Sequence, residues 1–313
     1  MPAEVPPDRL PSTELRNRAS TDLDHLSTPQ ILALINEADA TVPAAVAAAL
    51  PGLGDLVEAG LAALREGGRV HYFGAGAGGR IALGDALELE PTYGVGPETL
   101  CPHLAGGPNA AYRADESAED SGPDAALADS HLAPADLVIG ITASGRTPYV
   151  AGALTAARAA GARTALISSD HTAPLARLAD LHIVLATGPE VVTGSTRMKA
   201  GTAQKLALNA FSTALMVRSG HTWSNLMVSA SAGNAKLRER AVRTLVAACR
   251  VAPAEALAAL DSCDGETATA LVVLAGGASP LTARQALAAC GGRPRAAVWA
   301  LAGPGSGPGP EPR

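Results

Sequence analysis

From about residue 69 onward the chain alternates between short apolar runs and longer Ala-rich stretches, with glycine-rich turns between them. The apolar runs contain few polar positions, which is typical of strands buried on both faces. Their alternation with helical stretches predicts β-α-β units and a parallel sheet. The five predicted strands are Val70–Phe73, Thr99–Leu104, Leu137–Ile141, Thr164–Ser168 and Leu181–Leu185.

Helices are predicted on both sides of this region. Ser27 or Thr28, followed by Pro29, forms an N-cap that opens a helix to about Ala38. Residues 42–65 predict a second helix, which Pro51 is expected to kink or divide. Beyond the last strand we expect helices over 198–218 and 234–251. Residues 254–301 predict three short amphipathic helices with breaks at Gly265, Gly276-Gly277 and Gly291-Gly292.

The same pattern divides the chain into domains. Residues 1–12 are Pro-rich and 302–313 are Gly/Pro-rich, so we expect both to be disordered tails. Residues 13–252 form the α/β domain with its N-terminal helices. Residues 253–301 form a small helical domain, which is too short for a large core and is expected to pack on the main domain or on a partner subunit.

Composition limits the functions to consider. With 313 residues, 47% of them hydrophobic, the chain can build a sizeable core. The net charge of −6, without any Lys/Arg run, argues against nucleic acid or an anionic membrane as a partner. Four scattered cysteines indicate neither a disulfide framework nor a zinc site, and no signal-peptide or membrane-spanning pattern is present. We therefore expect a cytoplasmic protein that binds small molecules.

Two glycine-rich loops follow predicted strands, where parallel sheets bind their ligands. Gly74-x-Gly76-x-x-Gly79 is similar to a dinucleotide fingerprint, but the next strand does not end in the acidic residue that would bind the ribose. In the second loop, Ser144 and Thr147 place hydroxyls at a helix start, which suits an anion. An ordinary N-cap is the alternative interpretation of the second loop.

A longer motif carries a resemblance to a known family. The run is Gly188-Pro-Glu-Val-Val-Thr-Gly-Ser-Thr-Arg-Met-Lys-Ala-Gly-Thr-Ala-Gln-Lys205, and shorter matches occur at Pro91-Thr-Tyr-Gly94, Ala118-Glu-Asp120, Asn225-Leu-Met-Val228 and Asn234-Ala-Lys-Leu237. Together these resemble the N-acetylmuramic acid 6-phosphate etherases, from about Thr13 to Val298. The resemblance implies a three-layer α/β sugar-isomerase (SIS) domain with a small C-terminal UBA-like helical domain.

The resemblance also implies the chemistry. The expected activity is that of a carbon–oxygen lyase, which converts N-acetylmuramic acid 6-phosphate into N-acetylglucosamine 6-phosphate and D-lactate without metal or redox cofactor. It implies Glu88 as the acid that protonates the departing lactate and Glu119 as the base at C2, with Glu90 and Glu116 as nearby carboxylates of no assigned role. A homodimer with the site at the subunit junction is expected. The residues expected to bind substrate or its phosphate are Gly76, Ala77, Gly78, Ser144, Gly145, Arg146, Thr147, Glu190, Ser195, Thr196, Arg197 and Lys199.

The chain departs from the family at several positions. Ala77-Gly78 replaces a Thr-Ser pair, Ser229 stands where Asp is usual, and Leu87 and Leu89 surround Glu88 with more apolar surface. Two alternatives stay open: a non-catalytic sugar-phosphate sensor, similar to the glucokinase regulatory protein, and an aldose–ketose isomerase of the same fold. The retained glutamates argue against the sensor, and the 188–205 motif argues against the isomerase.

Overall fold

The computed structural model describes residues 10–115, 117–229 and 235–303, and the side chains of residues 124, 125 and 129 lie outside the description. The chain divides into two compact units, Met1–Ala86 with Pro97–Ser212 and Leu87–Gly96 with Thr213–Arg313. Most of each predicted tail, residues 1–9 and 304–313, lies outside the described residues. Ser12, at the end of the first tail, donates a hydrogen bond from its hydroxyl to the carbonyl of Ser169.

The first unit contains a sheet of five parallel strands in the order β2-β1-β3-β4-β5. All five predicted strands are confirmed, with each end within one residue of its expected position. The order reverses direction between β1 and β3, which makes the carboxyl ends of these two strands the topological switch point of the sheet. The strands are β1 (Val70–Gly74), β2 (Leu100–Leu104), β3 (Leu137–Ile141), β4 (Arg163–Ser168) and β5 (Leu181–Val184).

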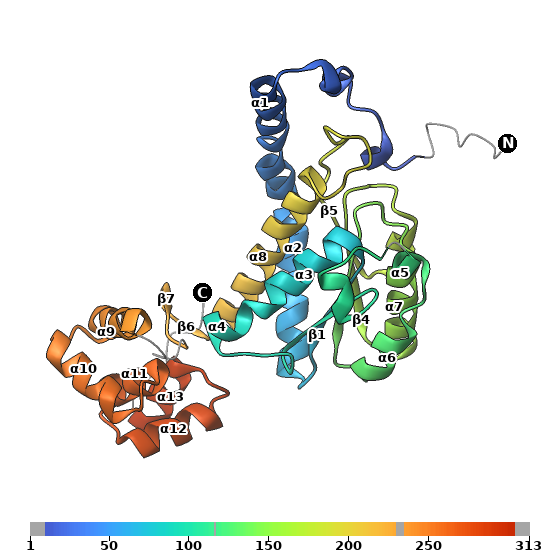
Figure 1. Ribbon diagram of the computed structural model, residues 1–313. Helices are drawn as coiled ribbons and strands as arrows, with labels where there is room; N and C mark the ends of the chain where they lie inside the picture. The colour runs from blue at the N-terminus through green and yellow to red at the C-terminus, as the bar shows by residue number, and fades with distance from the viewer. Residues whose placement is uncertain (1–9, 116, 230–234, 304–313) are drawn as a thin grey trace. The chain divides into compact units, whose positions relative to one another are not determined.

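Helices cover both faces of the sheet, which confirms the three-layer architecture (Figure 1). On one face Phe73, Val138 and Leu166 pack with α7 (Pro148–Ala159) in a single buried cluster. On the other face Tyr72 packs against Phe211 of α8 (Lys199–Arg218). Because neighbouring strand residues point to opposite faces, both faces need apolar side chains, as the strand sequences predict.

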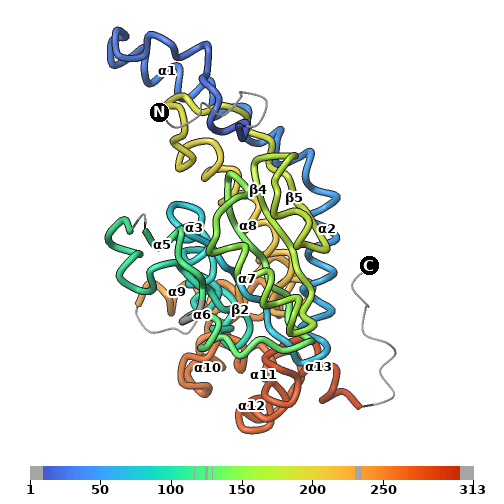
Figure 2. The backbone as a smooth tube through the Cα atoms, turned by 90° about the vertical axis from the view of Figure 1, so that its right-hand side faces the viewer, coloured from blue at the N-terminus to red at the C-terminus, as the bar shows by residue number. Residues whose placement is uncertain are grey.

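Helix α2 (Val42–Arg65) contacts β5, β1 and β3, and Figure 2 shows it running beside β5. Pro51 lies inside a continuous helix, so of the two expected effects the division does not occur. Pro51 is exposed, and burial of Leu53 and Leu56 on the opposite face offsets the lost hydrogen bond, which costs about 3 kcal/mol. The stretch Thr28–Arg65 is long and apolar enough to cross a membrane, a property that the core helices of folded domains share.

Over its described residues, the second unit consists of the segment 87–96, the end of α8 from Thr213, a two-stranded hairpin and five further helices. One core is formed by buried side chains of α9 (Ala235–Cys249), α10 (Pro253–Ser262) and α11 (Thr267–Gly276). A smaller core is formed by α11, α12 (Pro280–Ala289) and α13 (Pro294–Ala302). Up to residue 303, four helices follow residue 252 where three were expected. The three glycine breaks separate four segments, and Pro253, Pro280 and Pro294 each begin a helix. The predicted domain boundary at 252/253 falls inside this unit and stays a prediction.

The remaining elements follow in chain order. In the first unit they are three short 3₁₀ turns (Ser12–Glu14, Arg18–Ser20, Leu23–His25), α1 (Thr28–Asp39), α3 (Gly76–Leu87), η5 (Pro108–Ala111), α5 (Ser117–Asp120), α6 (Asp124–Ser130) and η6 (Pro174–Leu178). In the second they are α4 (Leu89–Tyr93), β6 (Thr222–Trp223), β7 (Leu226–Met227), α9 (Ala235–Cys249), α10 (Pro253–Ser262), α11 (Thr267–Gly276), α12 (Pro280–Ala289) and α13 (Pro294–Ala302).

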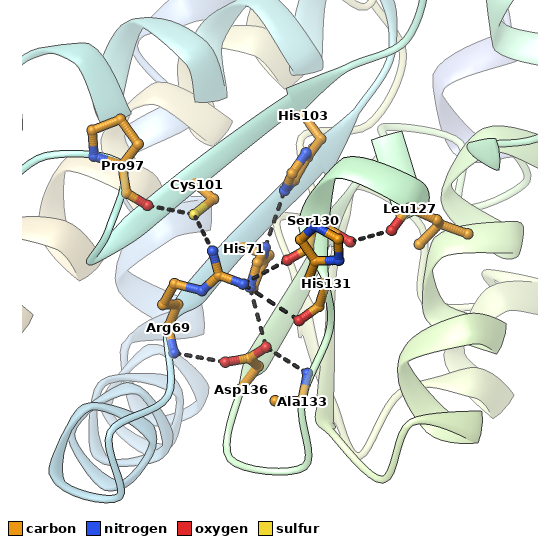
Figure 3. Close-up of polar contacts among 10 residues, drawn as sticks. All are labelled: Arg69, His71, Pro97, Cys101, His103, Leu127, Ser130, His131, Ala133 and Asp136. Carbon is orange, nitrogen blue, oxygen red and sulfur yellow. Dashed lines mark hydrogen bonds and ion pairs between the residues drawn. The ribbon is translucent and has the colours of Figure 1, made fainter. Parts of the chain in front are cut away.

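A buried polar network joins the three strands β1, β2 and β3 (Figure 3). The Asp136 carboxylate accepts hydrogen bonds from the backbone N–H groups of Arg69 and Ala133, each at 2.8 Å. His71 Nε2 lies 3.4 Å from Asp136 Oδ2, and its Nδ1 lies 3.0 Å from Nε2 of His103. Since Arg69 and Asp136 directly precede β1 and β3, their contact holds the amino ends of these strands together.

This network predicts acid sensitivity. Burial lowers the pKa of His71 and of His103 to about 4. In the unfolded chain both histidines take up protons near pH 6.5, so stability is fully present above that pH and is lost as the pH falls toward 4. We expect each histidine to contribute up to about 3 kcal/mol to this loss in chemical denaturation at pH 7 and pH 4.5. The His103→Gln variant lacks one of these titrating groups, so its free energy of unfolding should fall less between pH 7 and pH 4.5. Substitution of the exposed His25 in His25→Gln should leave this fall as large as in the parent.

Candidate functional site

The first loop brings a predicted catalytic carboxylate to the carboxyl end of β1. Gly76 begins α3 with φ +55°, and Glu119 Oε1 from α5 occupies the place where a Cβ on residue 76 would lie. Glycine is therefore required at position 76 both for its backbone conformation and for the close approach of Glu119. The two residues are 43 positions apart in the sequence, so the fold has joined two separately predicted parts of the site.

Ala77 and Gly78 form the first turn of α3 and are half-buried. Gly78 has an ordinary helical φ, so its conformation is open to any residue. A Cβ there would lie 3.1 Å from Gln204 Oε1 and 3.3 Å from Ile141 Cγ2, which is tight contact. Space at Gly78 is thus limited by side chains of α8 and β3.

The second loop groups its hydroxyls at the start of α7. Thr142 Oγ1 lies 2.8 Å from Thr147 Oγ1 and 3.5 Å from Ser144 Oγ, and the Arg146 N–H donates to Ser144 Oγ at 3.3 Å. Thr147 is the N-cap residue, but its side chain makes no capping hydrogen bond. The hydroxyls and the positive end of the helix dipole therefore lie together, an arrangement that suits an anion.

The turn of this loop requires glycine. Gly145 has φ +68°, and a Cβ on it would collide with the side chain of Ala173 in the loop after β4. Its carbonyl accepts a hydrogen bond from the N–H of Leu175. The loops after β3 and β4 consequently hold each other in place, while the Arg146 side chain is exposed.

In the 188–199 run, Glu190 and Lys199 contact the chain itself. Glu190 is fully buried, and its carboxylate accepts hydrogen bonds from the N–H groups of Lys199 at 3.0 Å and Ala200 at 2.9 Å. Lys199 Nζ donates to the carbonyl of Thr187 at 2.6 Å. In this arrangement Glu190 caps α8, and Lys199 ties the helix start to the preceding loop. Ser195 and Thr196 are half-buried, and Arg197 is exposed.

We expect Glu190→Gln to lower the free energy of unfolding by about 1–2 kcal/mol. The amide keeps one acceptor oxygen for the two N–H groups and loses the attraction between its charge and the helix dipole. Urea denaturation followed by circular dichroism measures the effect. The matched control is Glu255→Gln, an exposed acid in the first turn of α10, which should change stability by no more than about 0.5 kcal/mol. Equal losses in both variants would contradict the capping role.

Glu88 belongs to the second compact unit, whereas Glu119 and the two loops belong to the first. Glu88 stands at the N-cap of α4 with an exposed side chain, next to exposed Leu87 and buried Leu89. The helix ends at Gly94 with φ +69°, against the side chain of Ser229. The segment that carries Glu88 therefore packs against Ser229, two residues after the end of β7 in its own unit. Glu116 and Asn234 lie outside the described residues.

A cavity of about 650 Å³ lies in the first unit, lined by residues that include His103, Tyr112 and Tyr149. None of its lining residues is Asp, Glu, Lys or Arg, and none belongs to the two loops at the ends of β1 and β3. An anionic ligand therefore suits the loops better than this cavity. Among the described residues, no group of three or more His, Cys, Asp or Glu could hold a metal ion.

Sequence reasoning assigned no role to Thr142, just before the second loop, or to Gln204, which lies in the 188–205 motif. The Thr142 hydroxyl lies beside those of Ser144 and Thr147. The signal in the sequence that could have revealed it is a polar residue directly after a buried strand. Gln204 lies among buried residues of α8 beside Gly78. Its place at the loop depends on the packing of α8, which no local pattern in the sequence reveals.

Comparison with known proteins gives two family matches and many similar sequences. The SIS domain model matches residues 119–214, and the model of the glucokinase regulatory protein N-terminal SIS domain matches residues 53–158. The N-acetylmuramic acid 6-phosphate etherase of Thermobifida fusca is 55% identical over 262 residues, covering 84% of this chain and 86% of that protein. The etherase of Mycolicibacterium smegmatis is 47% identical over 268 residues, covering 85% and 90% respectively.

The solved structures to which this chain is similar include a phosphoheptose isomerase from Francisella tularensis. It is 15% identical in sequence, covers 61% of this chain and 98% of its own, and has a TM-score of 0.47.

Proposed function

Because the chain belongs to the N-acetylmuramic acid 6-phosphate etherase family, we propose that it is the enzyme that removes D-lactate from N-acetylmuramic acid 6-phosphate. The observation that carries this proposal is the 55% identity to a curated etherase over most of both chains. The chain is thus an enzyme that acts on a sugar phosphate, and its reaction is proposed to be a carbon–oxygen lyase reaction with N-acetylglucosamine 6-phosphate as the other product.

The phosphate is proposed to bind at the start of α7. This helix N-terminus combines the Ser144 and Thr147 hydroxyls with backbone N–H groups, and a dianion gains from both. Ser195, Thr196 and Arg197 remain further candidates for substrate contact. Glu190 and Lys199 are proposed to act by shaping the loop, since they are engaged with Ala200 and Thr187.

We expect Ser144→Ala to weaken the binding of N-acetylglucosamine 6-phosphate by about 0.5–3 kcal/mol, the range for a lost hydrogen bond to a charged group. Binding of unphosphorylated N-acetylglucosamine should barely change, because the lost contact is to the phosphate. Isothermal calorimetry measures both. Thr155→Ala removes an exposed hydroxyl later in the same helix and should leave both affinities unchanged. Equal losses for the two sugars would assign Ser144 to helix capping alone.

The proposed reaction needs two proton-transfer groups and no cofactor. After the sugar ring opens, a base removes the C2 proton, the C2–C3 double bond forms, and the C3–O bond breaks as an acid protonates the departing lactate. Water then adds to C3. Glu119, whose carboxylate lies against Gly76 at the switch point, is the proposed C2 base, and Glu88 is the proposed acid that later activates the water.

A homodimer with the site at the subunit junction is part of the proposal. An isologous pair is the commonest oligomer of soluble proteins, and the resemblance to the etherases favours it here. The free state of all four cysteines is compatible with the proposed cytoplasmic location. Sedimentation equilibrium of the purified protein tests the dimer.

Release of lactate is the direct test of the function. The purified protein is incubated with N-acetylmuramic acid 6-phosphate, and lactate is measured with a coupled dehydrogenase. The match to the glucokinase regulatory protein model over residues 53–158 makes a non-catalytic sugar-phosphate sensor the second candidate. A chain that binds the sugar phosphate but releases no lactate at high protein concentration would support the sensor and overturn the etherase.

A further inference from the structure

Gln204 is a buried polar side chain without a partner for its donor. It lies on α8, its exposed fraction is 2%, and its Nε2 makes no hydrogen bond to the described residues. A buried amide N–H without a partner costs about 1–3 kcal/mol of desolvation. Such a residue is costly to the free protein, and a bound ligand that accepts its hydrogen bond would recover this cost.

Gln204 also lies at the place where this fold binds ligands. Its Oε1 and Nε2 are 3.1 and 3.5 Å from the position of a Cβ on Gly78, in the first turn of α3. The same position is 3.3 Å from Cγ2 of Ile141, the last residue of β3. The amide is therefore placed between the carboxyl ends of β1 and β3, which form the topological switch point.

The charges around the loops indicate which part of a sugar phosphate this amide meets. Glu119 presents its carboxylate to Gly76, two residues from Gly78, and a negative carboxylate repels a phosphate dianion. The hydroxyls and helix dipole that suit the phosphate lie on the next loop, at Ser144 and Thr147. The uncharged end of the substrate is thus left for the α3 loop.

We propose that Gln204 is a substrate-binding residue whose Nε2 donates a hydrogen bond to an uncharged oxygen of the sugar, a hydroxyl or the acetamido carbonyl. This inference rests on the proposed function for the identity of the sugar, but not for the position of the site. Gly78 is part of the arrangement, because any side chain there would crowd the amide. Glu119 and Gln204, which lie against Gly76 and Gly78 in the first turn of α3, then both border the bound sugar.

The test compares Gln204→Met with the parent protein. Methionine has nearly the same length and no donor, so we expect at least tenfold weaker binding of N-acetylglucosamine 6-phosphate and less than twofold change for inorganic phosphate, both by calorimetry. The thermal midpoint should stay equal or rise, because the unpaired buried donor has been removed. A residue with only a structural role would lower the midpoint and leave the sugar affinity unchanged.

Two further variants complete the design. Gln204→Leu also removes the donor and adds no charge, so it should likewise weaken the sugar phosphate at least tenfold if the methionine variant does not fold. Ser212→Ala removes a buried hydroxyl of the same helix that bonds to Asp85, and it should lower the midpoint without changing either affinity. Unchanged sugar affinity in both Gln204 variants, or equal losses for sugar phosphate and phosphate, would overturn the inference.

The two proposals fail in different ways. If the parent protein releases no lactate but Gln204→Met still weakens N-acetylglucosamine 6-phosphate selectively, the etherase reaction is wrong and the Gln204 contact stands. If the parent turns over N-acetylmuramic acid 6-phosphate and both Gln204 variants keep its KM and kcat, the function stands and the contact is wrong.

Discussion

Glu88→Gln is expected to lower kcat for lactate release by about 10²–10⁴, the usual contribution of a general acid. The substitution keeps the size of the side chain and removes the proton that lactate needs as it leaves. Because Glu88 is exposed and makes no capping hydrogen bond in α4, stability should change little. Steady-state release of lactate measures the effect, and calorimetry with N-acetylglucosamine 6-phosphate should show affinity within about threefold of the parent, since no phosphate contact is lost.

Glu90 supplies the matched control for this first experiment. It lies two residues further along α4 and is likewise exposed, so Glu90→Gln removes the same charge from the same turn. Turnover of this variant should stay close to that of the parent. If Glu90→Gln were as slow as Glu88→Gln, the loss would reflect the charge of the segment 87–96, and Glu88 would have no particular role as the acid.

Glu119→Gln is expected to stop the exchange of the C2 proton with solvent. The parent should introduce deuterium at C2 of the sugar when turnover takes place in deuterium oxide, because the proposed base exchanges its proton with solvent between steps. An amide cannot take up that proton, so both exchange and lactate release should fall by about 10²–10⁴. Proton NMR of the product measures the deuterium content, and the lactate assay measures the rate.

Asp120 and Gly76 separate the chemistry of Glu119 from its packing. Asp120→Asn removes an exposed carboxylate next to Glu119 and should leave exchange intact. Gly76→Ala would force the Glu119 carboxylate out of its place, so we expect exchange to fall although the carboxylate is retained. Continued exchange in Glu119→Gln would contradict the assignment and would make Glu116 the next residue to test.

Part of the candidate site was accessible to sequence reasoning because its signals are local. The Ser144–Thr147 loop was predicted from hydroxyls at a helix start after a buried strand, and the structure places these hydroxyls together at the start of α7. Glu190 and Lys199 were predicted to contact substrate, and the structure engages their side chains with the start of α8 and the loop before it. A glutamate and a lysine in one motif indicate a site rich in charge. Whether the Glu190 carboxylate contacts a ligand or the N-terminus of α8 depends on the conformation of the loop between Glu190 and Lys199.

The sequence by itself determined the five strands, their parallel arrangement and most helix limits, because apolar runs, glycines and prolines act on the backbone within a few residues of where they stand. Only the tertiary structure decided that Glu119 lies against Gly76 and that Gln204 lies against Gly78. These pairs are 43 and 126 residues apart, and each contact forms because helices pack on the sheet at the ends of β1 and β3. Burial patterns specify that a helix packs, whereas the side chain that reaches a loop depends on the position and rotation of the packed helix.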